Sequence, residues 1–192
     1  MKFKRVFWVV ALITALSSLL YARAAQVALG ELVKKSEVIV IGKVSCVWPI
    51  DGGRIAWLEV TQTLKGDPKV KQLAFWASPT WMCDINEANE GETVLLLLTS
   101  ANSFDSSGIL KKYPSLSNYL KRNSPNSPLF FVNESGAGRM VITNNIVERN
   151  GYVIYPKEIQ VVERRPLQYG HRYFSLLKDV VGSIQTTLSA TK

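Results

Sequence analysis

The chain has 192 residues and a formal net charge of +8, from 23 lysines and arginines against 15 aspartates and glutamates. A chain of this length can form one domain with a sizeable core. It contains two cysteines and one histidine, which are too few to build a zinc or other transition-metal site from the usual Cys and His ligands. We therefore expect no metal and no cofactor.

The first residues have the three parts of a secretory signal peptide. They are a basic start at residues 2–5, a mostly apolar stretch at 7–20 and a small-x-small cleavage site at Ala22-Arg23-Ala24. We expect residues 1–24 to be removed, so that Ala25 begins a periplasmic or secreted chain. The alternative is an uncleaved N-terminal anchor, although the apolar stretch is short for a membrane span. No second long apolar stretch follows, so the mature chain is expected not to span a membrane.

Cleavage would also lower the net charge. The leader holds four basic residues and no acidic one, which leaves the mature chain at +4 with its basic residues scattered. Nucleic-acid-binding domains concentrate basic residues on one face. We therefore expect no nucleic-acid partner.

The next hundred residues predict a series of strands after a short leading helix. The helix is expected over 26–35, and the strands over 36–48, 54–66, 70–78 and 92–100. Asp51-Gly52-Gly53 predicts a hairpin turn between the first two strands. The first strand is nearly all apolar and is expected to be buried, and the fourth is apolar enough to be covered on both faces.

Residues 101–128 break this pattern with Ser, Asn, Gly and Pro, and predict a long surface insertion. At least two strands follow it, and Asn150-Gly151 is expected to turn a hairpin between them. Apolar residues then recur at steps of three and four, which predicts an amphipathic helix over 168–190 that covers one end or face. The stripe contains Phe174, Leu177, Val181, Ile184 and Leu188. Several short strands at regular spacing indicate a small barrel or sandwich, a single domain over 25–192.

Four segments carry a resemblance to a known group. "SEVIVIGKV" after a short helix, "LEVTQTLKG", a cysteine before "EGETVLLLL", and "GAGRMVI" together resemble secreted bacterial netrin-like proteins. These share the OB-fold of the inhibitory domain of tissue inhibitors of metalloproteinases. The resemblance implies a mainly β, OB-like Greek-key barrel with a short N-terminal helix, an insertion after strand four and a C-terminal amphipathic helix. It does not imply inhibition, because those inhibitors bind the protease zinc through an N-terminal cysteine and the mature chain is expected to begin with Ala25.

Cys83 in "WMCDINEANEGETVLLLL" (residues 81–98) has two candidate roles. As a nucleophile it would need a base, and the one histidine of the chain is His171. As half of a disulfide it would pair with Cys46, which fits an exported chain with two cysteines. We favour the Cys46–Cys83 disulfide.

The acidic residues after Cys83 begin like a calcium-binding EF-hand loop. Ala88 and Asn89, however, occupy positions where that motif requires an oxygen ligand and a glycine. A looser calcium site is an alternative, but a solvated turn before the fourth strand fits better. There is no Gly-x-Ser-x-Gly elbow, and "SGAGR" (135–139) lacks the Lys-Ser/Thr ending of a phosphate-binding loop. No catalytic residue is assigned, and the protein is expected not to be an enzyme.

The tryptophans provide the candidate binding residues. If the aliphatic residues on either side of Trp57 face the core, Trp57 faces outward, and Trp76 in the next strand lies near it. OB-folds bind ligands on the face of strands two and three and on the adjoining loops. Trp57, Trp76 and Trp81 are therefore the candidates. The alternative is that other elements cover them, since large aromatic residues are usually well buried.

These observations favour an exported, non-enzymatic OB-fold module that binds a protein partner in the periplasm or extracellular space. The surface used would be the Trp57/Trp76 face or the insertion. An alternative is an inhibitor or regulator of an extracellular hydrolase that does not act by zinc chelation. A third hypothesis is a nucleic-acid-binding OB-fold that stacks bases on the same tryptophans, against which export and the mild charge argue.

Overall fold

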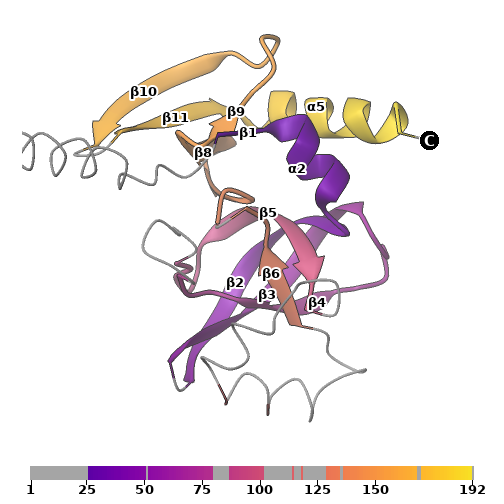
Figure 1. Ribbon diagram of the computed structural model, residues 1–192, viewed down its shortest axis with the longest axis vertical. Coiled ribbons are helices and arrows are strands. Elements are labelled where there is room, and N and C mark those ends of the chain that lie inside the picture. Colours follow the sequence, from indigo (N-terminus) through magenta and orange to yellow (C-terminus); the bar gives the residue numbers. More distant parts are fainter. Residues whose placement is uncertain are drawn as a thin grey trace, which may run out of the picture.

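The computed structural model describes residues 26–50, 52–79, 87–101, 114, 118, 129–134, 136–167 and 170–191. Figure 1 shows the elements in these segments. In chain order they are β1 (Val27–Ala28), α2 (Leu29–Lys35), β2 (Val38–Ile50), β3 (Gly53–Lys65), β4 (Gln72–Trp76), β5 (Thr93–Ser100), β6 (Leu129–Val132), β7 (Arg139–Thr143), β8 (Ile146–Asn150), β9 (Val153–Ile154), β10 (Val161–Leu167), β11 (Gly170–Leu176) and α5 (Leu177–Ser189).

Five of these strands close into a barrel. β2, β3 and β4 form an antiparallel meander, β4 pairs in parallel with β6, and β6 pairs with β5, which returns to β2. The strand order β2-β3-β4-β6-β5 is that of a small OB-like Greek-key barrel. The mainly β fold class with a helix near each end is thus confirmed.

Strand β5 belongs to two sheets at once. One of its edges pairs with β2, while the other pairs with β7 through Thr93–Leu96 and with β6 through Leu98–Ser100. Where the partner changes, the Leu97 N–H donates to the Gly138 carbonyl at 2.9 Å and the Leu97 carbonyl accepts from the Asn133 N–H at 3.0 Å. Beyond β7 the sheet continues through β8 and β11 to β10, outside the barrel.

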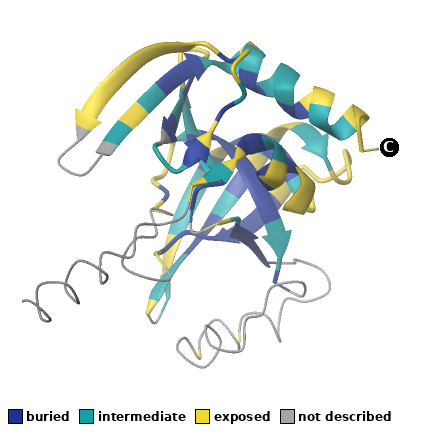
Figure 2. Ribbon diagram, turned by 45° about the horizontal axis from the view of Figure 1, so that its top comes forward, coloured by how far each residue is buried: buried dark blue, intermediate teal, exposed yellow. Residues whose placement is uncertain are grey.

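Alternate side chains of β5 enter two different cores. Leu96 and Leu98 face the barrel interior, whereas Leu95 and Leu97 face a second core under the helices. All four are fully buried, which confirms the prediction that this strand is covered on both faces. β2 is buried on both faces in the same way, with Val40 in the barrel and Ile39 in the second core. Figure 2 shows these buried residues gathered in the central strands.

The second core is covered by α2 and α5, which pack against each other. α2 contributes Leu29, Leu32 and Val33. α5 contributes Val180 and Ile184 as fully buried residues. The apolar stripe of each helix therefore packs against the outer face of the barrel strands β2 and β5.

The C-terminal helix begins later than the sequence predicts. Residues Gly170–Leu176 form strand β11, and the helix starts at Leu177. Phe174 continues the helical spacing by coincidence, because it lies in a strand opposite Glu148 of β8 and Glu163 of β10. Aromatic side chains favour a strand where neighbouring strands are present to pair with.

The hairpin predicted at Asn150-Gly151 is wrong in position. β9, which follows this pair, does not pair with β8 but runs parallel to β1, with Val27 opposite Val153. The tight turn lies instead at Asn144-Asn145, between β7 and β8. Both asparagines have positive φ, 51° and 62°, which is the backbone that a two-residue hairpin requires.

Three sequence predictions fall largely outside the described residues. They are the signal peptide over 1–24, nearly all of the insertion over 101–128 and the segment around Cys83. Among the helices of the described residues, none has the length and apolar character that crossing a membrane would take.

Because β5 lies in both cores, we expect Leu96→Ala and Leu97→Ala to destabilise the protein to a similar extent. Each removes a fully buried leucine, which costs about 2–5 kcal/mol. Urea unfolding followed by circular dichroism measures both, and a single shared transition is expected in each variant. If one variant melted only part of the structure, the two cores would be independent and this account of β5 would be wrong.

Candidate functional site

The outer face of β2, β3 and β4 carries the tryptophans that the sequence singled out. Ala56 and Leu58 face the barrel interior, so Ile55 and Trp57 lie on the opposite face. This alternation agrees with the orientation predicted for Trp57. The same face holds a third apolar cluster, formed by Ile55, Ala74, Trp76, Ala101, Leu129 and Phe131, with Ile50 and Trp57 packed against it.

Trp76 lies inside this third cluster and offers no surface to a partner. Its side chain is 0% exposed, and its ring lies 6.5 Å from that of Phe131, centroid to centroid. The other end of the ring lies on Gly53, where a Cβ would come within 2.2 Å of a ring carbon. The proposed Trp57/Trp76 binding face therefore loses Trp76, because Gly53 and its neighbours form a closed pocket for the indole.

Trp57 is half-buried, and Trp48 is the exposed tryptophan of this face. Trp48 lies opposite Ile55 in the β2–β3 ladder and is 63% exposed. Trp48 is not among the candidates that the sequence pattern indicates. The available signal was its place close to the Asp51-Gly52-Gly53 turn, where fewer strands remain to cover a side chain.

The position of Trp48 follows from the lengths of the strands. β5 pairs with β2 only as far as Lys43, and Val44 exchanges backbone hydrogen bonds with the turn before β5. Beyond Val44, the described residues of β2 pair only with β3. The hairpin tip, which we define as residues 46–50 and 52–57, therefore has only one described strand neighbour on its β2 side, whereas Ile55–Trp57 on its β3 side still pair with β4. Figure 1 shows the end of the β2–β3 hairpin reaching beyond the neighbouring strands.

Cys46 lies on the same face of the hairpin tip, directly opposite Trp57, and is half-buried. Its predicted partner Cys83 and the candidate Trp81 lie outside the described residues. The disulfide and the role of Trp81 therefore stay predictions.

His171 lies in β11, far along the chain from the tryptophan face. Its ring nitrogens contact the Arg164 guanidinium at 2.9 and 3.1 Å, and its ring lies 6.1 Å from that of Tyr173. Within the part of the chain that the structure describes, no group of three or more His, Cys, Asp or Glu side chains is placed to hold a metal ion. The absence of an enzyme activity, a metal and a cofactor stays a prediction.

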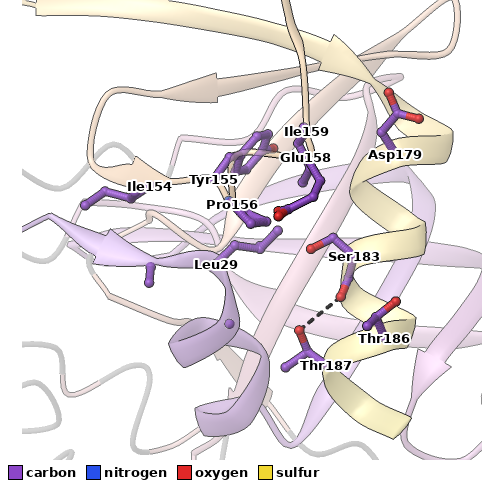
Figure 3. A pocket seen from close by; sticks show the side chains of 12 residues that line it. Leu29, Ile154, Tyr155, Pro156, Glu158, Ile159, Asp179, Ser183, Thr186 and Thr187 are labelled. Atoms are coloured by element: carbon purple, nitrogen blue, oxygen red, sulfur yellow. Dashed lines mark hydrogen bonds between the residues drawn. The ribbon is translucent and has the colours of Figure 1, made fainter. Parts of the chain in front are cut away.

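A second candidate surface is a groove of about 610 Å³ on the other side of the molecule. Figure 3 shows its three walls, which are the start of α2, the segment from Ile154 to Ile159 and one face of α5. Its volume falls within the range of about 300–1,000 Å³ that is usual for small-molecule sites. No sequence pattern marks it, because its walls come from segments far apart in the chain.

Tyr155 forms part of the floor of this groove. Burial raises the pKa of its phenol, and the nearby Arg149 charge offsets this only in part, so the hydroxyl stays protonated. The Arg149 guanidinium lies 4.3 Å above the Tyr155 ring and 4.3 Å from that of Tyr173. Burial lowers the pKa of Arg149. The guanidinium therefore stacks on a ring that forms part of the groove floor.

We expect Gly53→Ala to destabilise the protein by about 2 kcal/mol, because the new Cβ overlaps the rigid Trp76 ring and forces repacking. Gly30→Ala in α2 is the matched control. A Cβ at Gly30 meets no atom within 4 Å, so this change should be neutral or stabilise by up to about 1 kcal/mol. Chemical denaturation measures both, and equal effects would contradict the closed indole pocket.

The predicted disulfide has its own test. Peptide mapping of the non-reduced protein should yield a linked peptide that contains Cys46 and Cys83, and reduction should lower stability by up to about 4 kcal/mol. Alkylation of both thiols without prior reduction, in protein prepared from an oxidising compartment, would exclude the bond.

No known protein-family model matches the chain, and no curated protein matches its sequence. Any function is therefore argued from the two surfaces themselves.

Proposed function

We propose that this protein is an exported, non-enzymatic OB-like module that binds a protein partner through the hairpin tip, with Trp48 as the anchoring side chain. The observation that carries this proposal is the 63% exposure of Trp48 near the end of the β2–β3 hairpin. Exposed tryptophan is costly in water and is enriched among the residues that contribute most to protein–protein binding.

The surroundings of Trp48 support this role. Its neighbours on the same face are the half-buried Trp57 and Cys46, so a shallow apolar surface flanks the exposed indole. A salt bridge between Arg54 and Glu87 ties the hairpin to the segment before β5. An anchor whose backbone is already ordered loses little conformational entropy on binding.

Capture experiments test the proposal directly. The purified mature protein should capture a partner from the envelope and secreted fractions of its source, and Trp48→Ala should weaken binding by about 30-fold or more, as expected for a hot-spot residue. Because Trp48 is exposed, the thermal midpoint of the Trp48→Ala variant should equal that of the wild type. Val70→Ala, which alters another exposed apolar residue, is the matched control and should bind like the wild type.

A loss of binding that tracked a loss of stability in Trp48→Ala would contradict an anchoring role. So would undiminished capture of the same partner. The inhibitor alternative is separated by a further assay, in which the mature protein is added to any hydrolase that it captures. Stoichiometric loss of hydrolase activity, absent with Trp48→Ala, would identify the partner class as an inhibited enzyme.

A further inference from the structure

The groove between α2 and α5 has an apolar floor and a polar rim. The floor consists of Leu29, Tyr155 and Ile159, which are 1%, 8% and 5% exposed. Pro156 extends this apolar floor. On the α2 side, the last residue that lines the groove is Gly30, which has no side chain. A ligand that fills the groove would therefore need an apolar body.

The lining side chains that carry charge are all acidic. Glu158 and Asp179 line the groove, whereas no lysine, arginine or histidine does. Figure 3 shows the Glu158 side chain directed into the groove, beside Leu29 and across from α5. Asp179 lies in the first turn of α5, where the helix dipole stabilises a negative charge. The charged side chains of the lining are thus acidic within a chain whose net charge is positive, and the Arg149 cation that stacks on Tyr155 does not itself line the groove.

Two of the three hydroxyl groups on the α5 wall, those of Thr186 and Thr187, act as acceptors toward a ligand. Thr187 Oγ1 donates to the Ser183 carbonyl at 3.0 Å, and Thr186 Oγ1 donates to the Gly182 carbonyl at 2.9 Å. Because each hydroxyl has used its single proton within the helix, only its lone pairs remain for a ligand. The two threonines and the two carboxylates of the rim therefore favour a ligand that donates hydrogen bonds, while the Ser183 hydroxyl can either donate or accept.

We propose that this groove binds an amphiphilic organic cation, with its ammonium or guanidinium group held by Glu158, the Asp179 carboxylate at the end of the α5 wall adding to the attraction, and an aliphatic or aromatic body on the Leu29–Tyr155–Ile159 floor. An anion would be repelled by both carboxylates. A neutral apolar molecule would leave them uncompensated. The chemistry fits both a free amine and a lysine or arginine side chain of a peptide with apolar neighbours.

Three probes with one body and different charges test the proposal. Hexylammonium, hexanol and hexanoate are titrated into the purified protein, and amide shifts of groove residues are followed by NMR. Hexylammonium should bind about tenfold more tightly than hexanoate, with hexanol between them. Equal affinity for the three, or shifts that lie outside the groove, would overturn the proposal.

Variants confirm that the carboxylates are responsible. Glu158→Gln should weaken hexylammonium binding by about three- to fivefold, as expected for an exposed ion pair, and Asp179→Asn by a smaller factor because it lies at the end of the α5 wall. Glu90→Gln, at an exposed acidic residue in the turn before β5, is the matched control and should bind normally. If a variant with both Glu158→Gln and Asp179→Asn bound hexylammonium as tightly as the wild type, the carboxylates would not hold the cation.

A pair of glycine variants tests the groove without altering charge. Gly30 lines the groove and Gly182 does not, and a Cβ at either position meets no atom within 4 Å. Gly30→Leu should fill the groove and abolish binding, whereas Gly182→Leu should preserve it, with both helices intact by circular dichroism. Retained binding in Gly30→Leu would place the ligand elsewhere.

A last arm separates the two sources of the cation. The blocked peptide acetyl-Leu-Lys-Leu-amide is titrated beside hexylammonium. Tighter binding of the peptide, lost in Glu158→Gln, would identify a basic peptide segment as the ligand. Tighter binding of hexylammonium would identify a free amine.

Discussion

Strand β5 must bury both of its faces, and the rest of the structure depends on that constraint. Its leucines alternate between the barrel interior and the second core, and all four are fully buried. A strand of this kind needs a layer on each side. The barrel supplies one layer by closing on itself, and α2 with α5 supplies the other. The change of partner at Leu97 lets the same strand close the barrel and begin the extended sheet.

The two candidate surfaces lie where burial of both faces of β5 leaves side chains uncovered. One side of the barrel is covered by the helices, and the apolar cluster on the face of β3, β4 and β6 is itself buried. The hairpin tip stays exposed because β5 stops pairing with β2 at Lys43. The groove exists because α5 packs on α2 through Val180 and Ile184 and turns its Ser and Thr face toward the segment after β9.

The sequence was informative where the pattern was local. The continuous apolar run at 36–48 predicted a buried strand and that at 92–100 a strand covered on both faces, since a period-two pattern disappears when neither side meets water. It failed where a distant segment decided the outcome. Asn150-Gly151 has the stronger hairpin signal, but β1 takes the following residues as its partner. Phe174 fits a helical stripe as well as it fits a strand, and only β8 and β10 decide between them.

The candidate site shows the same division. Alternation along β3 placed Trp57 correctly on the outer face. It could not distinguish a buried outward-facing indole from an exposed one, because Trp76 is covered by residues from other parts of the chain, among them Phe131. Trp48 differs from Trp76 in its place on β2, beyond the last residue of β2 that pairs with β5. The groove was invisible for the related reason that Leu29, Tyr155 and Asp179 meet only in the folded protein.

The two surfaces can act independently, although β2 connects them. Its first half packs under α2 through Ile39, and its far end carries Trp48. A shift of β2 by one residue along its neighbours would exchange the side chains of its two cores. Gly42 opposes such a shift, because a Cβ in its place would lie 2.3 Å from the Glu59 carbonyl oxygen. Substitutions at the two surfaces should therefore have additive effects, as is usual for sites without shared partners.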